Sequence, residues 1–443
     1  MAEVWRRALV VGSVMLVGAL GTAPAGQAAS RVQHVVSPGG IEAYLIPEHS
    51  IPFLSLALHF KGGSALDPAG KEGLAYMVSG LLDEGAGELD SQAFRTELED
   101  RAIRLSFEAG RDAFTGQLKT LTEHRERAFE LLRMALNEPR FDAEPVERIR
   151  HQIQAELRRR AEDPDQVVTL TWFETAFPKH PYGKPVEGTA ESVANITATD
   201  LRRFIGARLA KDNLVVGVAG DVTPEQLGVL LDRAFGDLPA TSAAIDLPEA
   251  VPAAAGTIVV RRDVPQSRVM FGQAGLPRAD PDFYAAYVAN HILGGGGFGS
   301  RLTEEVREKR GLAYSVYSHL YPMDHGPLWI GGVGTANAAV GESIRLVQAE
   351  VARMAEGDVD AATLADAKTY ITGSFPLRLT SNDQIASMLV SMQVDDLGID
   401  YLERRNDYIE AVTLADVRRV AQRLYHPDEL LTVVVGAPTG LEG

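Results

Sequence analysis

Arg307 and Tyr314 are the two side chains whose types and spacing best suit chemistry at a carbonyl group. A guanidinium and a phenol can both donate hydrogen bonds to an oxygen that becomes negative during reaction, which is what oxyanion stabilisation requires. Arg307 lies near the end of a segment with helical spacing, and Tyr314 lies on the alternating segment after Gly311. A turn at Gly311 can bring both groups to one side. Taken singly, Arg307 is equally explained as a solvated helix charge and Tyr314 as a half-buried strand aromatic.

Four consecutive glycines precede this pair: Gly294, Gly295, Gly296 and Gly297. Without Cβ atoms, their backbone can adopt left-handed conformations and another chain can approach their amides closely. We expect loop, helix, turn and strand in that order over residues 290–318. The glycines then form either a substrate-binding lip or a plain flexible hinge.

This stretch resembles the second-domain signature of the pitrilysin or insulinase family of zinc peptidases (M16), which includes the mitochondrial processing peptidase. The resemblance rests on Ser-Arg-Leu at 300–302, on Arg-Glu-Lys-Arg-Gly-Leu-Ala-Tyr-Ser-Val at 307–316 and on the glycines before them. It extends over essentially the whole chain after the N-terminal segment. It implies that Arg307 and Tyr314 contact substrate in an active site whose metal lies elsewhere.

The zinc motif of that family is missing where the resemblance places it. A helix after a turn at Asp67 should carry His-x-x-Glu-His, in which two histidines bind zinc and the glutamate activates water. Here the three positions hold Tyr76, Ser79 and Gly80. Tyrosine and glycine do not replace a neutral imidazole, and serine is no general base. Glu156 stands about where the third ligand of the family falls, and without the histidines we interpret it as a solvated or ion-paired carboxylate.

The ten histidines predict no other metal site, because none pairs at i, i+4 with a carboxylate between. We interpret His291 as a satisfied core histidine, His180 as a structural loop residue, and His319 and His325 as strand and turn residues. The sequence therefore predicts no cofactor in this chain, and the resemblance implies zinc in a partner subunit.

Composition and charge restrict the class of protein further. With 443 residues, 45% of them apolar, the chain is globular and long enough for two or three domains. A formal charge of −17 argues against a nucleic-acid partner. There is no cysteine, which excludes disulfides and thiol nucleophiles.

The N-terminus predicts export. Arg6 and Arg7 precede an apolar run at 8–20 and small residues at 21–29, the pattern of a secretory signal peptide over residues 1–29. An uncleaved anchor is the alternative, and the arginine pair leaves twin-arginine export open. Export without disulfides fits a bacterial periplasm.

The chain also contains an internal duplication. Asp200, Asp212 and Gly220 recur as Asp416, Asp428 and Gly436, each 216 residues later, around similar helix and strand sequences. Between the copies, residues 239–256 are rich in alanine and proline and predict a linker. We therefore expect a first domain at 30–238 and a second at 257–443. By resemblance the fold is α+β, with two duplicated α/β sandwiches of the mitochondrial processing peptidase type forming half of a clam shell.

Local patterns predict further elements. They are strands at 42–46 and 53–60, a helix from Gly73 to residue 86, a helix capped by Ser91, a hairpin of 105–107 with 113–118, and a long charged helix at 144–166.

The leading hypothesis is a non-catalytic, substrate-binding subunit of a heterodimeric zinc peptidase. Its partner would be a homologous M16 chain with an intact motif, its substrate a peptide. The alternative is a structural or peptide-binding homodimer without peptidase activity, and self-association of the isolated chain stays open. A third hypothesis is an active homodimer with an unrecognised metal site.

Overall fold

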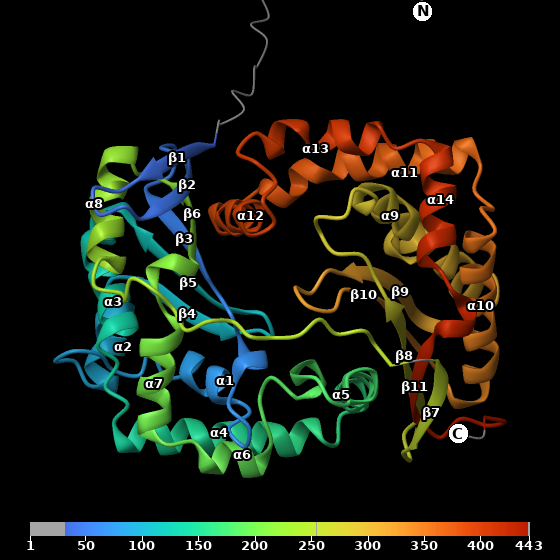
Figure 1. The fold of residues 1–443 in the computed structure, drawn as a ribbon, viewed down its shortest axis with the longest axis horizontal. Helices are drawn as coiled ribbons and strands as arrows, with labels where there is room; N and C mark the ends of the chain where they lie inside the picture. Colours follow the sequence, from blue (N-terminus) through green and yellow to red (C-terminus); the bar gives the residue numbers. More distant parts are fainter. Residues whose placement is uncertain (1–31, 254, 442–443) are drawn as a thin grey trace, which may run out of the picture. The chain divides into compact units, whose positions relative to one another are not determined.

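The computed structural model describes residues 32–253 and 255–441, in which two β-sheets are each covered by helices (Figure 1). The first sheet has the strand order β1-β2-β6-β3-β5-β4 and the second the order β7-β11-β8-β10-β9. The described residues form one compact unit. The predicted signal peptide lies outside the described residues. Within them, no helix has the length and hydropathy of a membrane span.

The first sheet contains β1 (Gln33–Val36), β2 (Glu42–Pro47), β3 (Phe53–Lys61), β4 (Arg104–Ala109), β5 (Ala113–Leu121) and β6 (Leu214–Gly220). The helices of this half are α1 (Leu74–Ser79), α2 (Ser91–Asp100), α3 (Arg125–Asn137), α4 (Ala143–Arg160), α5 (Pro164–Ala176), α6 (Ala190–Asn195), α7 (Ala198–Arg208) and α8 (Pro224–Phe235). The predicted strands and hairpin are confirmed, with ends shifted by a few residues.

The second sheet contains β7 (Gly256–Arg261), β8 (Gln266–Ala274), β9 (Ala313–Tyr321), β10 (Leu328–Ala336) and β11 (Leu431–Gly436). The helices of this half of the chain are α9 (Phe283–Asn290), α10 (Val340–Ala355), α11 (Ala361–Ser374), α12 (Asn382–Val394), α13 (Tyr401–Glu410) and α14 (Leu414–Leu424). Residues 239–253 and 255 contain neither helix nor strand.

The duplication appears as matching helix–strand units. In both α7 and α14 a capping box opens the helix, from Thr197 and Asp200 in the first copy and from Thr413 and Asp416 in the second. The strands that follow, β6 and β11, lie inside their sheets. Their continuous apolar sequences fit strands that are buried on both faces. The predicted fold of two duplicated α/β units is confirmed.

Each sheet receives a helix from the other half of the chain. Helix α12 packs on β2, β3 and β6 of the first sheet, and α5 packs on β8 and β11 of the second. Trp172 of α5 is fully buried and donates its indole hydrogen bond to the carbonyl of Leu431 at 3.1 Å. On the other side, Lys119 of β5 reaches Asp383 of α12 at 2.8 Å. The two sheets are therefore interlocked by an exchange of helices.

Three local predictions are wrong. Helix α1 ends at Ser79 instead of continuing towards residue 86, because Gly80 ends it and turns follow. The cap of α2 is Asp90, whose carboxylate accepts from the backbone of Ala93, and Ser91 is the first helical residue. The helix expected at 144–166 divides, since Asp163 caps a new helix that begins at Pro164.

Gly217 of β6 lies where α12 approaches most closely. A Cβ built there would be 2.3 Å from the carbonyl oxygen of Ala386. We expect Gly217→Ala to lower the free energy of unfolding by about 1–3 kcal/mol, because the helix must move away from the sheet. Chemical denaturation measures this.

Gly206→Ala is the matched control, because Gly206 lies in α7 and no atom lies within 4 Å of the built Cβ. At this position alanine should leave the free energy of unfolding unchanged or raise it by up to about 1 kcal/mol. Equal stability of the two variants would show that α12 is not closely packed on the first sheet.

Candidate functional site

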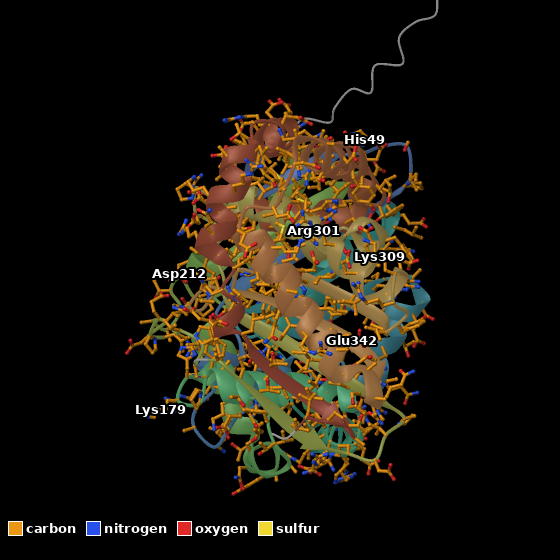
Figure 2. The ribbon with its side chains drawn as sticks, turned by 90° about the vertical axis from the view of Figure 1, so that its right-hand side faces the viewer. His49, Lys179, Asp212, Arg301, Lys309 and Glu342 are labelled. Atoms are coloured by element: carbon orange, nitrogen blue, oxygen red, sulfur yellow. The ribbon has the colours of Figure 1, made fainter. Side chains whose placement is uncertain are left out.

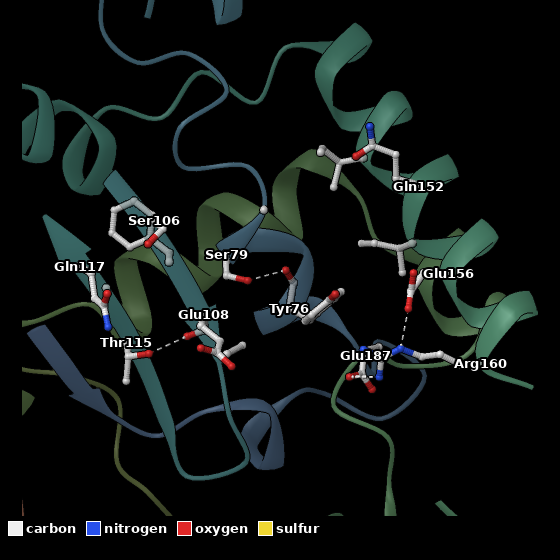
Figure 3. Close-up of a pocket in the computed structure, with 16 residues that line it drawn as sticks. Tyr76, Ser79, Ser106, Glu108, Thr115, Gln117, Gln152, Glu156, Arg160 and Glu187 are labelled. Carbon is white, nitrogen blue, oxygen red and sulfur yellow. Dashed lines mark hydrogen bonds and ion pairs between the residues drawn. The ribbon is translucent and has the colours of Figure 1, made fainter. Parts of the chain in front are cut away.

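The residues at the positions of the lost zinc motif line one cavity in the first half (Figure 3). The cavity measures about 660 Å³ and lies between α1, α4 and the edge strand β4. Tyr76, Ser79 and Gly80 come from α1 and its C-terminus, and Glu156 comes from α4. The sequence therefore placed these four positions together correctly.

The polar groups of this cavity are engaged with one another. The Ser79 hydroxyl donates to the backbone carbonyl of Tyr76 at 2.8 Å. Glu156 accepts from Arg160 at 3.0 Å and is also paired with Arg159, and Arg160 reaches Glu187 at 2.6 Å (Figure 3). The interpretation of Glu156 as an ion-paired carboxylate is confirmed.

These residues do not fit a zinc ion. Zinc sites in proteins use imidazole, thiolate or carboxylate ligands, and only Glu156 belongs to that set among the four motif positions. Its carboxylate is already neutralised by two guanidinium groups. Across the described ranges, no group of three or more histidine and acidic side chains is arranged to hold a metal ion.

Arg307 and Tyr314 lie beside each other in the second half. The Arg307 guanidinium carbon is 5.8 Å from the centre of the Tyr314 ring and 4.8 Å from that of Phe298. Both distances fall in the range of cation–π contacts. Arg307 belongs to the π-helical segment Thr303–Glu308, and Tyr314 to β9. The turn between them thus brings the two side chains together, as expected from the sequence.

A β-bulge explains why Tyr314 faces outward. Ala313 pairs with Thr335 and Ser315 pairs with Gly334, so Tyr314 is an extra residue on the strand. Regular alternation would place Tyr314 on the buried face with Val316, but it is 79% exposed. Bulges re-aim side chains in this way, often next to functional sites. The interpretation of Tyr314 as half-buried is wrong.

The bulge adds Tyr314 to an aromatic row on β9 that sequence reasoning missed. Tyr317 stacks on His319, with ring centres 6.1 Å apart, and His319 meets Tyr321 edge-on. Burial lowers the pKa of His319, which favours its neutral form. Tyr314, Tyr317 and His319 line a groove of about 480 Å³ between β9, β10 and α5. The alternation of aromatic residues at 317, 319 and 321 was the available signal.

The four glycines do not form one loop. Gly294 and Gly295 lie in the π-helical segment His291–Gly295, which continues α9. A Cβ on Gly294 would be 2.3 Å from the Ser318 hydroxyl, so this glycine permits close packing. The loop prediction is therefore wrong for Gly294 and Gly295. Gly297, with φ +58°, has open space around it and begins a short turn that ends at Gly299.

Among the histidines, the structure corrects one interpretation. His180 accepts a hydrogen bond from the backbone of Tyr182 and contacts the carbonyl of Pro248, as expected of a structural loop residue. His291 is only partly buried and lies against Tyr370, with ring centres 5.2 Å apart and planes tilted by 32°, and its ring has no hydrogen bond to any residue that the structure describes. It is not a satisfied core histidine.

Two family models match this chain. The one described as "Insulinase (Peptidase family M16)" matches residues 44–190, and the one described as "Peptidase M16 inactive domain" matches residues 195–371. The chain belongs to the peptidase M16 family. This confirms the resemblance inferred from the segment at 290–318.

Individual relatives agree with the M16 assignment. The chain is 29% identical over 366 residues to the "Non-peptidase homolog YmxG" of Helicobacter pylori, covering 82% of this chain and 83% of that one. It is 28% identical over 424 residues to an uncharacterized zinc protease of Streptomyces coelicolor, covering 89% and 84% respectively. The crystal structure of a peptidase M16 inactive domain from Pseudomonas fluorescens matches with a TM-score of 0.86 and 28% identity, covering 93% and 99%.

M16 membership and the altered motif together support a non-catalytic role. The cavity occupies the place where the resemblance puts the zinc site of active members, but Tyr76, Ser79 and Gly80 supply no ligand and Glu156 is paired with arginine. What this M16 chain keeps is the pair at Arg307 and Tyr314.

Restoring the motif tests whether Arg160 opposes a metal. We expect the triple variant Tyr76→His, Ser79→Glu, Gly80→His to bind zinc weakly, because Arg160 holds a positive charge beside Glu156. Adding Arg160→Gln should tighten zinc binding at least tenfold, since one charge at short range costs about 1–4 kcal/mol. Competition with a chromophoric chelator measures the affinity.

Arg158→Gln in the same triple variant is the matched control, because Arg158 is exposed on α4 and does not line the cavity. It should leave the zinc affinity of the triple variant unchanged. If Arg160→Gln had no larger effect than Arg158→Gln, the guanidinium would not be what opposes a metal here.

Proposed function

We propose that this chain is the non-catalytic, substrate-binding subunit of a heterodimeric, zinc-dependent M16 peptidase. The observation that carries the proposal is the exposed Tyr314 phenol, turned outward by a bulge and lying beside Arg307. Tyr314, Tyr317 and Tyr321 are all exposed on β9, and a contiguous exposed aromatic row of this kind marks a surface that contacts another molecule.

The chemistry divides between the two subunits. A homologous partner with an intact His-x-x-Glu-His motif supplies zinc and the glutamate that activates water. Tyr314 donates a hydrogen bond to the carbonyl oxygen of the scissile bond as it becomes negative, and Arg307 holds a neighbouring carbonyl of the peptide. Both groups are donors, as this role requires.

The groove beside the pair suits an extended peptide. β9 is an edge strand, and its outward-facing aromatic side chains lead into the groove. The groove is also lined by Gly332 and Gly334 of β10, which permit the Tyr317 ring and the Arg268 guanidinium to lie close to the sheet. Tyr317 and His319 then contact alternate side chains of the peptide.

A second candidate is a peptide-binding or structural homodimer without peptidase activity. The name of the Helicobacter pylori relative, a non-peptidase homolog, favours it. Co-purification distinguishes the two: a second M16 chain with an intact motif and peptidase activity supports the heterodimer, whereas a stable, inactive homodimer supports the alternative. For either assembly we propose the periplasm, on the sequence of residues 1–29.

Tyr314→Phe removes only the phenolic hydroxyl. With the partner present, we expect turnover to fall at least tenfold, because losing one oxyanion donor costs about 10² to 10³ in rate. Assembly, followed by size-exclusion chromatography, should be preserved.

Tyr321→Phe, on the same strand but outside the groove, is the control and should retain most of the turnover. If the two variants behaved alike, the Tyr314 hydroxyl would have no special part in the reaction.

The glycine segment is tested at one of its open positions. We expect Gly299→Ala to raise KM at least threefold without loss of stability, because its built Cβ meets no atom within 4 Å, its φ is not left-handed and alanine stiffens the lip. Gly297 is left unchanged, because alanine is strained at its φ of +58°. Steady-state kinetics of the assembled enzyme gives KM.

Gly294→Ala is the contrasting variant and should lower stability, since its Cβ meets Ser318. An unchanged KM in Gly299→Ala would show that residues 297–299 only connect the two segments and do not contact the substrate.

A further inference from the structure

The glycine segment, residues 294–299, lies between two π-helical turns that both pack on β9. The first turn, His291–Gly295, continues α9 and overlaps the segment, and the second, Thr303–Glu308, contains Arg307. π-helical turns are rare and occur often at functional sites. What holds these turns on β9 therefore matters for the position of Arg307.

Two buried side chains, Asn290 and Thr303, hold the turns on the strand. Asn290 is the last residue of α9, and its Nδ2 donates to the carbonyl of Ser318 at 3.2 Å. The Thr303 hydroxyl donates to the carbonyl of Val316 at 3.5 Å. Because the two carbonyls are two residues apart on β9, they point to the same side of the strand. The two side chains therefore occupy one edge of β9.

Asn290 makes three hydrogen bonds and uses both ends of its amide. Its Oδ1 accepts from the Ser318 hydroxyl and from the Trp329 indole nitrogen, both at 2.8 Å. An indole N–H can only donate, which fixes the amide oxygen on that side and leaves Nδ2 for the Ser318 carbonyl. Asn290 is 5% exposed, and its two partners are buried more deeply. The amide thus joins α9 to both β9 and β10 in one orientation.

The pair of Asn290 and Ser318 also explains two of the glycines. A Cβ on Gly294 would lie 2.3 Å from the Ser318 hydroxyl, and a Cβ on Gly295 would lie 2.7 Å from Nδ2 of Asn290. In a closely packed interior, any larger residue would push the chain away from this pair. The first part of the glycine segment therefore takes its position from Asn290 and Ser318.

The position of the glycine segment reaches Arg307 through Phe298. The Arg307 guanidinium carbon lies 4.8 Å from the ring centre of Phe298, which belongs to the segment, and 5.8 Å from that of Tyr314 on β9. Cation–π attraction needs a ring within about 6 Å, so the guanidinium keeps both contacts only while the segment and the strand keep their spacing. Asn290 sets that spacing, although its own hydrogen bonds go to neither ring.

We propose that Asn290 is a positioning residue for the pair of Arg307 and Tyr314. Its amide fixes the glycine segment against β9, Phe298 then directs the guanidinium, and the bulge directs the phenol. The effect on catalysis rests on the proposed function, whereas the effect on the position of Arg307 concerns this chain alone. The two effects are therefore measured separately.

Nuclear magnetic resonance of the isolated full chain tests the position of Arg307. Its Nε–H signal, identified by its loss in Arg307→Lys, is displaced by the ring currents of Phe298 and Tyr314. We expect Asn290→Ala to move this signal towards that of free arginine, because the segment is no longer fixed on β9. Ser318→Ala removes one of the three hydrogen bonds and should move the signal in the same direction by less, so the test holds even if Asn290→Ala folds poorly. An unmoved signal in the folded variants would overturn the proposal.

Asn213→Ala is the matched control, because Asn213 is a similarly buried amide in the first half, 7% exposed. Its Nδ2 donates to the carbonyls of Lys61 and Arg208 at 3.0 and 2.9 Å, and its Oδ1 accepts from the backbone of Ala210 at 3.3 Å. Removing this amide therefore breaks the same number of hydrogen bonds as Asn290→Ala.

The control position is remote from Arg307. Its neighbour Asp212 lies apart from Arg301 and Lys309, which flank the turn that contains Arg307 (Figure 2). Both alanine variants should lose thermal stability, but only the one at Asn290 should move the Arg307 signal. Equal displacement in both variants would show a general loosening of the fold and refute the assignment.

The assembled enzyme tests the effect on catalysis. With the partner present, Asn290→Ala should lower kcat/KM about tenfold to hundredfold, because a group displaced by about 1 Å can cost about 10² in rate. In an Arg307→Gln background the same change should cost less than threefold, since the guanidinium that it displaces is already absent. Asn213→Ala should retain most of kcat/KM.

The outcomes separate this inference from the proposed function. A full loss of kcat/KM from Asn290→Ala in the Arg307→Gln background would assign Asn290 a merely structural role. If no M16 partner gave peptidase activity while the Arg307 signal moved as expected, the proposed function would be wrong and the positioning role of Asn290 would stand.

Discussion

The exchange of helices between the two sheets is the constraint on which the rest of this structure depends. A sheet with one covered face would expose apolar side chains on the other, and here each missing cover comes from the opposite half of the chain. Helices α5 and α12 begin at residues 164 and 382, close to the spacing of the duplication, so they are equivalent elements that have changed places. Fused copies that exchange an equivalent element cannot separate without exposing both sheets. Glycines at the two crossing points, Gly217 under α12 and Gly272 under Trp172, show how close the approach is.

This constraint also determines where the candidate sites lie. Because α5 covers the second sheet only in part, β9 and the neighbouring strand β10 keep an open face beside it, and the groove with Tyr314 forms there. The bulge then turns one further ring into that groove. In the first sheet, the edge strand β4 instead faces the cavity of the lost zinc motif. The two halves thus have their cavities at corresponding edges of the two sheets. The one beside β9 is lined by aromatic side chains, and the one beside β4 contains ion pairs.

The sequence predicted those features whose causes are local or repeated. The duplication, the central strands β6 and β11 and the pairing of Arg307 with Tyr314 all follow from periodicity and turn residues. The outward direction of the Tyr314 side chain could not be predicted in this way. It is caused by a bulge, and a bulge depends on the register with β10, which no local pattern records. The helical state of Gly294 was hidden for the same reason, since glycine is favoured there by the nearness of Ser318. The exchange of α5 and α12 depends on contacts between residues about ninety or more positions apart, which no local pattern records.

The cavity at the positions of the zinc motif has a further physical meaning, because a partly buried carboxylate without a metal needs another cation as partner. Glu156 is only partly exposed, and without compensation its charge would lose hydration without gaining a partner. Arg160 supplies the positive charge and extends it to Glu187, while Arg159 adds a second contact. The cavity is therefore electrostatically balanced by its own side chains. The charge of Glu156 is thus balanced by arginine, which agrees with the non-catalytic role of this chain.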